Sequence, residues 1–520
     1  MGLLLHQSID DSAERSANAE AFRCGGMALT YGELVERANQ LASFLVAEGV
    51  RPMDRVGIYM HKGLELPVAL YGILKAGAAY VPIDPSSPAA RINLLIRDCG
   101  LRHLVTNASR ARQACGLTQA GLECVIGVPD GGKPSGIRIY SWEDVAAADG
   151  GAPSVRVTGM DLAYIMYTSG STGVPKGLMH THESGLAYAR LSAQTYGVGP
   201  DDRLGNHSPL HFDMSTFEYL TGPLCGATTV IIPEETTMFP VSLAALIESE
   251  KLTFWYSVPL ALIQLLTHGG IESRDASSLR WILFGGEPFP PKYLRRLMDL
   301  WPQARFSNSY GPAEVNQCTC FHLPPGRIVD DQPVPIGTVW EGAEGLVVDD
   351  DDQVVAPGES GELMVRAPTM MRGYWGRPDL NDSSFLVQEP VQGFRKVFYR
   401  TGDLVREGTD GLLVFLGRKD RQIKIRGYRV ELDEVENVLA SLEEVTEAAA
   451  VAGRDEAGNA VVMAAVQLNS GAMINVGELR QRAAERLATY AVPGPLRIVP
   501  SFPRTGSGKI DRRAVAAMFD

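Results

Sequence analysis

The chemistry-bearing feature of this chain is the segment Tyr-Thr-Ser-Gly-Ser-Thr-Gly-Val-Pro-Lys-Gly at residues 167–177. Its three glycines allow backbone N–H groups to turn towards a ligand, and four aliphatic hydroxyls and one ammonium group add to a site suited to oxyanions. The segment is not a mononucleotide P-loop, because it lacks the Gly-x4-Gly-Lys-Ser/Thr spacing. Taken alone, it is equally consistent with a flexible linker rich in serine and glycine.

A loop of this kind needs a rigid element to position it, and the apolar run at residues 162–166 is predicted to be a buried strand directly before it. Strand-like runs alternate with amphipathic helical patterns along most of the chain. The other predicted strands are residues 56–60, 79–83, 125–128, 228–232, 253–258 and 281–284, and two predicted helices are residues 31–47 and 243–250. This order predicts an α/β fold with mostly parallel sheets covered by helices.

From about Pro333 the pattern changes to short strands, with turn signals at residues 348–352 and 408–411, which predicts a β-barrel-like subdomain. The segment at residues 422–427 and a Glu-rich helix from Leu432 begin a small α+β lobe. We therefore expect a large N-terminal lobe, residues 1–419, with two mostly parallel helix-covered sheets and the β-rich subdomain. A small mobile C-terminal lobe would comprise residues 420–520.

Composition narrows the classes of function. With 520 residues the chain exceeds the size of a single core, and its formal charge of −13 argues against a nucleic-acid partner or an anionic membrane. No apolar run reaches the length of a membrane span, and the N-terminus lacks a basic region and a cleavage signature, which predicts a cytoplasmic protein. Seven scattered cysteines indicate reduced thiols, and Cys318 and Cys320 are more simply buried small residues than a metal pair.

Several motifs join the first in a fixed order. They are Asn-Ser-Tyr-Gly-Pro-Ala-Glu at residues 308–314, Tyr-Arg-Thr-Gly-Asp at 399–403, Gly-Arg-Lys-Asp-Arg-Gln-Ile-Lys-Ile-Arg-Gly at 417–427 and Arg-Thr-Gly-Ser-Gly-Lys-Ile-Asp at 504–511. Together they resemble the amino-acid adenylation enzymes of nonribosomal peptide synthesis, in the AMP-forming superfamily with acyl-CoA synthetases and luciferases. Residues 29–34, 74–82 and 361–375 match further motifs, so the resemblance covers essentially the whole chain.

The resemblance implies that a carboxylate attacks the α-phosphorus of ATP and expels pyrophosphate, which requires neutralisation of charge more than proton transfer. Glu314 should hold Mg²⁺, Asp403 should accept both ribose hydroxyls, and Arg418 should contact ribose or phosphate oxygens. Tyr310 should stack on the adenine. The other residues expected to bind ATP are Thr168, Ser169, Gly170, Ser171, Thr172, Gly173, Gly286, Glu287, Pro288, Asn308 and Ser309.

The resemblance also implies catalytic roles for two lysines. A lone lysine near a C-terminus is usually solvated, but Lys509 follows Gly506 and Gly508 in a motif that resembles the family's catalytic loop, where this residue reaches both the carboxylate and the α-phosphate. Lys176 should contact pyrophosphate, and Asp420 should be the hinge about which the small lobe rotates between half-reactions. One departure is Ala313, where the family usually has a threonine, so a hydrogen bond of about 0.5–1.5 kcal/mol is missing there.

Asp213, which follows Phe212, decides the predicted class of substrate, because it resembles the aspartate that pairs with an α-ammonium group. Aligned by motif, the rest of the pocket is Met214, Phe217, Tyr256, Leu283, Gly285, Ser309, Gln317 and Cys318. No second charge lies in this set, so the substrate should be neutral and small to medium in size.

Tyr256, Leu283 and Cys318 are similar to the pocket of free-standing prolyl-carrier-protein ligases, which predicts L-proline first. Gly285, Ser309 and Gln317 depart from that pattern, so alanine, serine, 2-aminobutyrate and a modified proline stay open.

Transfer to the phosphopantetheine thiol of a stand-alone peptidyl carrier protein is the predicted second step, because the eleven residues after Lys509 are too few for a carrier domain. An excised domain of a larger synthetase is the alternative. An acyl-CoA ligase and a catalytically silent binding protein are the rival functions; Asp213 argues against the first. The joint presence of Lys176, Glu314, Asp403 and Lys509 argues against the second.

Overall fold

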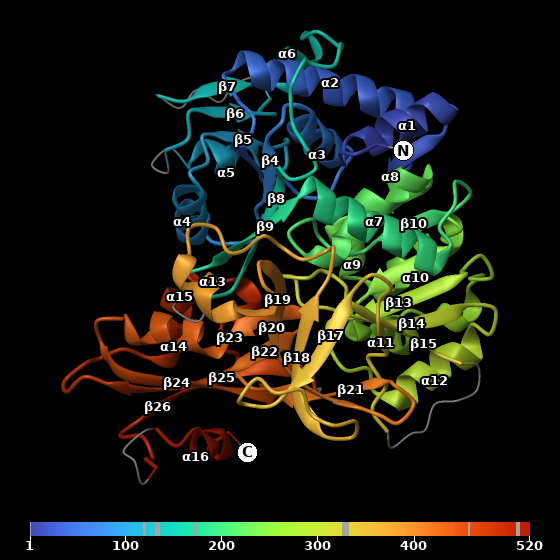
Figure 1. Ribbon diagram of the computed structural model, residues 1–520. Helices are drawn as coiled ribbons and strands as arrows, with labels where there is room; N and C mark the ends of the chain where they lie inside the picture. Colours follow the sequence, from blue (N-terminus) through green and yellow to red (C-terminus); the bar gives the residue numbers. More distant parts are fainter. Residues whose placement is uncertain are drawn as a thin grey trace. The chain divides into compact units, whose positions relative to one another are not determined.

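The computed structural model describes residues 2–117, 121–129, 136–170, 174–324, 332–455, 458–505 and 510–519 (Figure 1). The chain forms two compact units. The large unit contains Met1–Asp84, Gly100–Met166 and Gly177–Lys419, and the small unit contains Pro85–Cys99, Tyr167–Lys176 and Asp420–Asp520. Within the part of the chain that the structure describes, no helix is long and apolar enough to cross a membrane.

A first sheet lies in the N-terminal part of the large unit, and its described strands follow the order β7-β6-β5-β3-β4-β8-β9. The pairs from β7 to β8 are parallel, as predicted. The bounds are β3 Arg55–Ile58, β4 Ala79–Pro82, β5 His103–Val105, β6 Cys124–Ile126, β7 Arg138–Tyr140, β8 Leu162–Thr168 and β9 Lys176–Thr181, with helices α2 Tyr31–Ala47, α3 Glu65–Lys75, α5 Ala111–Cys115 and α6 Trp142–Ala146.

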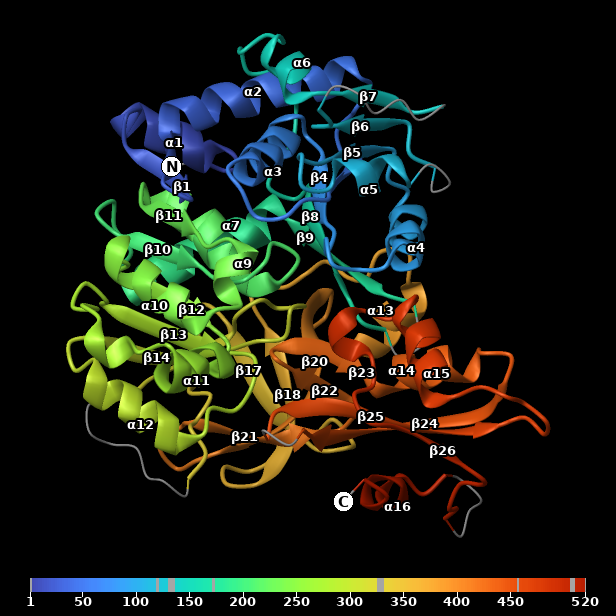
Figure 2. The same ribbon diagram turned by 180° about the vertical axis from the view of Figure 1, so that it is seen from behind.

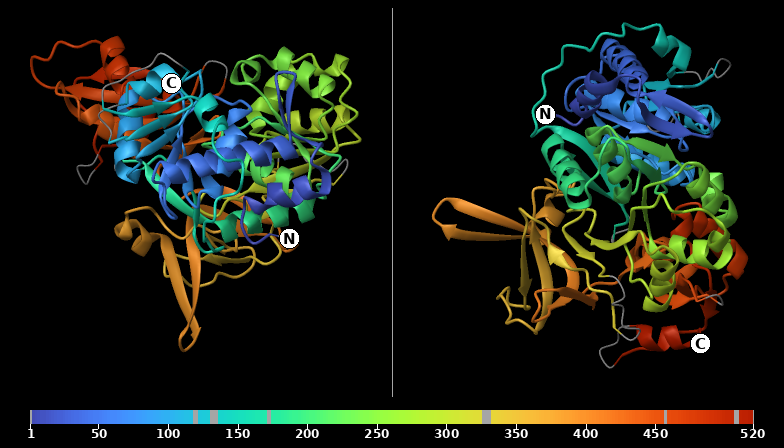
Figure 3. Two further views of the ribbon diagram at one scale, coloured as in Figure 1. Left: turned by 90° about the horizontal axis from the view of Figure 1, so that it is seen from above. Right: turned by 90° about the vertical axis from the view of Figure 1, so that its right-hand side faces the viewer.

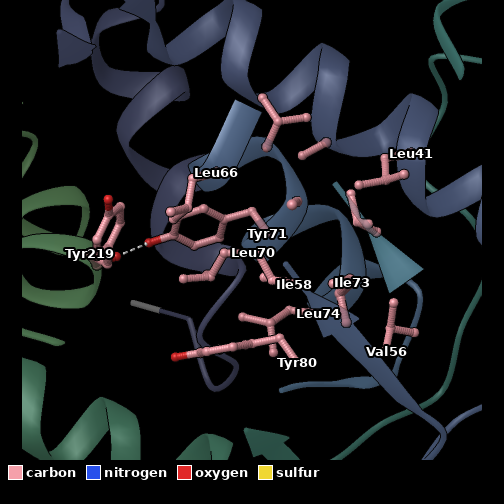
Figure 4. Close-up of a cluster of buried hydrophobic side chains, with 14 of the residues drawn as sticks. Leu41, Val56, Ile58, Leu66, Leu70, Tyr71, Ile73, Leu74, Tyr80 and Tyr219 are labelled. Atoms are coloured by element: carbon pink, nitrogen blue, oxygen red, sulfur yellow. Dashed lines mark hydrogen bonds between the residues drawn. The ribbon is translucent and has the colours of Figure 1, made fainter. Parts of the chain in front are cut away.

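Helix α2 begins and ends at the predicted residues because its start is encoded locally. The Thr30 side chain accepts a hydrogen bond from the Glu33 N–H, and the Glu33 side chain accepts one from the Thr30 N–H. This reciprocal cap satisfies two backbone donors that a helix start otherwise leaves unpaired. The buried face of α2 packs on α3, where Tyr71 lies among aliphatic side chains and its hydroxyl donates to the Tyr219 carbonyl at 2.7 Å (Figure 4).

The second sheet has the described strand order β16-β15-β14-β13-β12-β10-β11-β1-β2, parallel from β14 to β1. Helices α10, α11 and α12 cover one face (Figure 2), where Trp255, Ile282 and Phe306 point. The bounds are β1 Glu20–Cys24, β2 Met27–Thr30, β10 Arg203–Asn206, β11 Thr228–Ile231, β12 Phe254–Ser257, β13 Trp281–Gly285, β14 Arg305–Tyr310, β15 Thr319–His322, β16 Thr338–Val339, α1 Gln7–Ser16, α7 His182–Tyr196, α8 Gly222–Cys225, α9 Glu234–Thr237, α10 Pro240–Ser249, α11 Pro259–His268 and α12 Pro291–Leu300.

Helix α10 begins three residues earlier than predicted because Pro240 occupies its first turn, where a missing N–H has no cost.

The β-rich subdomain predicted from about Pro333 is an antiparallel sheet with the path β17-β18-β20-β19, and β21 pairs with β20. The described elements are β17 Glu344–Val348, β18 Ser360–Arg366, α13 Pro378–Ser384, β19 Phe385–Val391, β20 Phe394–Glu407 and β21 Leu413–Arg418. The β19–β20 hairpin, orange in Figure 3, extends away from the rest of this sheet.

The small unit has its own apolar core, formed mainly by α14 and a three-stranded sheet of the described order β24-β25-β26. Its elements are α4 Ala89–Cys99, β22 Gln422–Ile425, β23 Tyr428–Glu431, α14 Leu432–Ala440, β24 Val445–Arg454, β25 Ala460–Leu468, α15 Val476–Ala484, β26 Leu496–Val499 and α16 Arg512–Ala517. Arg426 and Gly427 both have positive φ, which gives β22 and β23 the tight turn that a two-residue hairpin favours.

An ion-pair cluster ties α16 to α14 in this unit. Glu436 accepts hydrogen bonds from Arg512 and Arg421 and from the Ala450 N–H, each at 2.7 Å at its shortest. Burial acts to raise the pKa of Glu436, but these three donors outweigh it and hold the pKa below the usual 4.5. A depressed folded pKa means that the charged carboxylate stabilises the fold above pH 4.5, and that this contribution is lost as pH falls through the folded pKa.

We therefore expect Glu436→Gln to lower the melting temperature by a constant amount between pH 7 and about pH 5.5. Below about pH 4.5 the difference from the unmodified protein should narrow, because the unfolded chain then binds a proton at Glu436 while the folded protein still holds the charge, and it should disappear once the pH is below the folded pKa. Thermal unfolding followed by circular dichroism across this range measures the difference, and Glu443→Gln, at an exposed position, is the control. A difference that does not change with pH would refute the role of the charge.

Candidate active site

Three residues predicted to bind the nucleotide contact one another in the large unit. Asp403 lies directly opposite Arg418 in the antiparallel β20–β21 pair, and Arg418 Nη1 is 2.5 Å from Asp403 Oδ1. The Tyr310 hydroxyl, at the end of β14, donates to Asp403 Oδ2 at 2.5 Å. Burial and then the Asp403 charge raise the pKa of Tyr310 well above its usual value, so Tyr310 stays a neutral donor. Ribose hydroxyls that donate to the Asp403 carboxylate would therefore compete with Arg418 and Tyr310, which already donate to it.

Six of the residues predicted to bind ATP are neighbours at the carboxyl ends of two parallel strands. Gly285, the last residue of β13, pairs with Ser309 of β14. The segment Gly286, Glu287 and Pro288 comes directly after β13, and it is therefore next to the last three residues of β14, which are Asn308, Ser309 and Tyr310. Gly286 has a φ of 86°, which turns the chain away at this point. The carboxyl ends of parallel strands are where open α/β sheets bind ligands.

Glu314 lies in the connection between β14 and β15, fully buried, and its Oε1 accepts a hydrogen bond from the Tyr374 hydroxyl at 2.9 Å. The nearby His180 Nε2 is 3.1 Å from the Ala313 carbonyl oxygen. Burial lowers the pKa of His180 to about 4, so it is neutral at pH 7. Among the described residues no group of three or more His, Cys, Asp or Glu side chains gathers to bind a metal.

A single carboxylate of this kind fits Mg²⁺, which is usually held by one or two carboxylates with waters and substrate phosphates.

The described part of the glycine-rich loop lies in the small unit with β23. Ser169 Oγ donates to the Arg429 carbonyl at 2.8 Å, and Lys176 Nζ is 3.6 Å from Glu431 Oε1. A Cβ atom on Gly170 would stand 1.9 Å from the Val174 carbonyl oxygen, so only glycine fits this bend. Four predicted site residues lie outside the described residues: Ser171, Thr172, Gly173 and Lys509.

The predicted substrate pocket is built on the face of the second sheet opposite α10–α12. Tyr256 of β12 pairs with Leu283 of β13, and both side chains join a buried cluster with Met214 and Phe217. Helix α7 covers this cluster with Tyr188 and Tyr196. The structure thus brings together four of the predicted pocket residues that come from three separate segments.

Asp213 begins the short 3-10 helix Asp213–Ser215 that precedes Met214 and the π-helical turn Phe217–Thr221. Its Oδ1 accepts a hydrogen bond from the Met214 N–H at 3.1 Å, and the side chain is partly exposed. Its chain neighbour Met214 belongs to the same buried cluster as Tyr256, and Phe212 packs against that cluster. Burial, then Tyr196 and the Asp213 charge, raise the pKa of Tyr256 well above its usual value, so Tyr256 is neutral. An acidic group at the edge of an apolar pocket suits an ammonium group.

Gln317 is connected to this pocket through Tyr196. Gln317 Nε2 donates to the Tyr196 hydroxyl at 2.8 Å and to the Thr319 carbonyl at 3.3 Å, and Tyr196 is 3.0 Å from Ser309 Oγ. The carbonyl of Thr319 fixes the amide orientation, because it can only accept. Gln317 Oε1 is buried without a hydrogen-bond partner among the described residues. Tyr196 was missed in the sequence because no motif marks the last residue of α7.

Cys318 packs in a different buried cluster, with Leu178, Val315 and Val365, and its Sγ is 3.7 Å from the Tyr310 carbonyl oxygen. Burial raises the pKa of the Cys318 thiol, so it stays protonated. Its predicted contact with the substrate therefore stays a prediction from the sequence.

Gly285 leaves no room for a side chain. A Cβ atom there would stand 2.1 Å from the Ser309 carbonyl oxygen on the neighbouring strand. Gly285→Ala should force β13 and β14 apart and lower the free energy of unfolding by about 1–3 kcal/mol. Urea unfolding measures this, with Gly494→Ala as the control because a Cβ atom at Gly494 meets nothing within 4 Å. Equal stabilities of the two variants would contradict the close approach.

The sequence matches the family described as AMP-binding enzyme over residues 9–375 and the AMP-binding enzyme C-terminal domain over residues 434–509. An L-proline--[L-prolyl-carrier protein] ligase of Pseudomonas fluorescens is 34% identical, over 99% of this chain and 99% of its own length. One from Streptomyces coelicolor is 36% identical, over 97% of this chain and 94% of its own length.

Among solved structures, the amide bond synthetase McbA from Marinactinospora thermotolerans is similar, with a TM-score of 0.87 and 26% identity. The alignment covers 99% of each chain.

Proposed function

The chain belongs to the AMP-binding enzyme family, and we propose that it is an AMP-forming ligase that activates L-proline and transfers it to a carrier protein. The observation that carries this proposal is the near-complete alignment with two proline ligases, joined to an acid, Asp213, at an apolar pocket. In the first step a proline carboxylate oxygen attacks the α-phosphorus of ATP, and the bond to pyrophosphate breaks. In the second, the phosphopantetheine thiolate of a peptidyl carrier protein attacks the prolyl carbonyl and AMP leaves.

In this proposal, some of the predicted site residues position the substrates and others neutralise their negative charge. Asp403 and Arg418 would hold the ribose, with Tyr310 against the adenine, and Asp213 would hold the proline ammonium. Glu314 would hold Mg²⁺, which supplies positive charge to the triphosphate when bound. Lys176 would contact the β- and γ-phosphates, and Lys509 would contact the carboxylate and the α-phosphate. Fixed cationic groups of this kind stabilise the negative charge that accumulates in the transition state.

A hinge at Asp420 would let the small lobe serve both half-reactions, with residues 1–419 as the core that binds both substrates. The division between the compact units falls between Lys419 and Asp420, which supports this assignment. We expect the enzyme to act in the cytoplasm, where ATP and a reduced thiol acceptor are present together.

Pyrophosphate exchange into ATP, measured with a panel of acids, tests the proposal. We expect exchange to be fastest with L-proline and slower with 4-hydroxyproline, alanine, serine and 2-aminobutyrate, because the two aligned relatives act on L-proline and the predicted pocket residues form an apolar cluster. A holo-carrier protein, not coenzyme A, should then accept the prolyl group. Exchange with benzoate or a fatty acid and with no amino acid would refute the proposal and support an acyl-CoA ligase.

A further inference from the structure

Lys176 is bound by an acid in the small unit. Its ammonium nitrogen lies 3.6 Å from Glu431 Oε1, with the two side chains only 11% and 6% exposed. Glu431 is the last residue of β23 and the N-cap of α14, but its side chain makes no cap hydrogen bond. The carboxylate is therefore turned towards cations instead of the helix, and Arg429 Nη2 also lies 3.3 Å from it.

The other described end of the glycine-rich loop contacts the same strand. Ser169, 3% exposed, donates its hydroxyl hydrogen to the Arg429 carbonyl of β23 at 2.8 Å. Ser169 and Lys176 are thus both held by β23, one through a backbone oxygen and one through a carboxylate. Two independent contacts of a phosphate-binding loop with one strand indicate that this conformation is specific.

The Glu431 carboxylate is chemically a substitute for a phosphate oxygen. A buried ammonium group requires an anionic partner, because an unpaired charge away from water is costly. In the conformation described, Glu431 supplies that partner. A pyrophosphate or triphosphate on the loop would supply it too, and the two anions would repel each other if both approached Lys176.

We propose that Glu431 is a positioning residue that competes with pyrophosphate for Lys176; this rests on the proposed function. Once pyrophosphate has left after the first half-reaction, Glu431 takes its place on the ammonium group. Reversal requires a pyrophosphate oxygen to attack the α-phosphorus and expel the prolyl carboxylate, with ATP formed again. By holding Lys176, Glu431 weakens the binding of pyrophosphate and so protects prolyl-AMP until the thiol attacks.

The test compares Glu431→Gln with Glu434→Gln. Glu434 is a matched control, because it is a buried acid of the same unit whose Oε1 pairs with a different cation, Arg91 Nη1, at 2.6 Å, with side chains 3% and 11% exposed. The rate of exchange is measured with L-proline and ATP fixed and pyrophosphate varied. Loading of the holo-carrier protein is measured in parallel, with and without added pyrophosphate.

Glu431→Gln should lower the KM for pyrophosphate about three- to tenfold, with a smaller change in kcat, and loading should become more sensitive to added pyrophosphate. Glu434→Gln should leave this KM unchanged. A KM for pyrophosphate that stays the same in Glu431→Gln, or that falls equally in both variants, would overturn the inference. If Glu431→Gln does not fold, Glu431→Asp, which keeps the charge but shortens its reach, should show a smaller decrease in this KM, and an unchanged KM again overturns it.

Failure of the proposed function can be distinguished from failure of this inference, because the unmodified protein would then show no pyrophosphate exchange with any amino acid.

Discussion

Lys509→Ala is expected to reduce proline-dependent pyrophosphate exchange by about a thousandfold, while ATP affinity changes by less than about threefold. The lysine would contribute its charge in the transition state, where the carboxylate and the α-phosphate approach, so its loss should fall on kcat. Described residues on either side of this segment contact one another: Ile510 pairs with Arg504, and the Asp511 N–H donates to the Pro503 carbonyl at 2.8 Å.

Exchange kinetics and equilibrium binding of ATP, measured on the same preparation, separate the two effects. Lys509→Arg is the control for charge, and it should recover only part of the activity, because a planar guanidinium does not reproduce a point charge. Exchange by Lys509→Ala at the unmodified rate would show that this lysine is not the catalytic one.

Asp213→Ala should raise the KM for L-proline by about 10- to 100-fold, which corresponds to loss of a charge-assisted hydrogen bond worth about 1.5–3 kcal/mol. The effect should be specific to the amino acid, so the KM for ATP should change little. Asp213 also accepts the Met214 N–H, so a structural role must be separated from an electrostatic one.

Asp213→Asn provides that separation, because the amide can still accept the Met214 N–H but carries no charge. We expect its KM for proline to be raised nearly as much as that of Asp213→Ala. Recovery of the normal KM in Asp213→Asn would show that the carboxylate charge does not bind the ammonium group, and that another residue does.

Much of the fold was predictable because its signals are local. The helix at residues 31–47, the apolar run at residues 162–166 and the strands at residues 253–258 and 281–284 each depend on a few neighbouring residues, and the structure confirms all of them within a few residues. The clustering of Met214, Phe217, Tyr256 and Leu283 was predictable only through resemblance, because their order in the chain does not reveal which strands are adjacent.

The remaining features depend on contacts between distant segments. Tyr196 lies 121 positions from its partner Gln317, and the pairing of Lys176 with Glu431 joins residues that no motif connects. Sequence patterns also assigned residues 85–99 and 167–176 to the first lobe, whereas their contacts group them with residues 420–520. Such groupings arise from tertiary packing, which local periodicity does not encode.

The transfer of oxygen from substrate to nucleotide tests the central claim most directly. L-Proline labelled with ¹⁸O in both carboxylate oxygens is incubated with ATP, Mg²⁺ and a holo-carrier protein, and the products are analysed by mass spectrometry. If the carboxylate attacks the α-phosphorus, AMP must carry one labelled oxygen and pyrophosphate none. Label in pyrophosphate or in inorganic phosphate, or prolyl-carrier formed with unlabelled AMP, would contradict an adenylating enzyme.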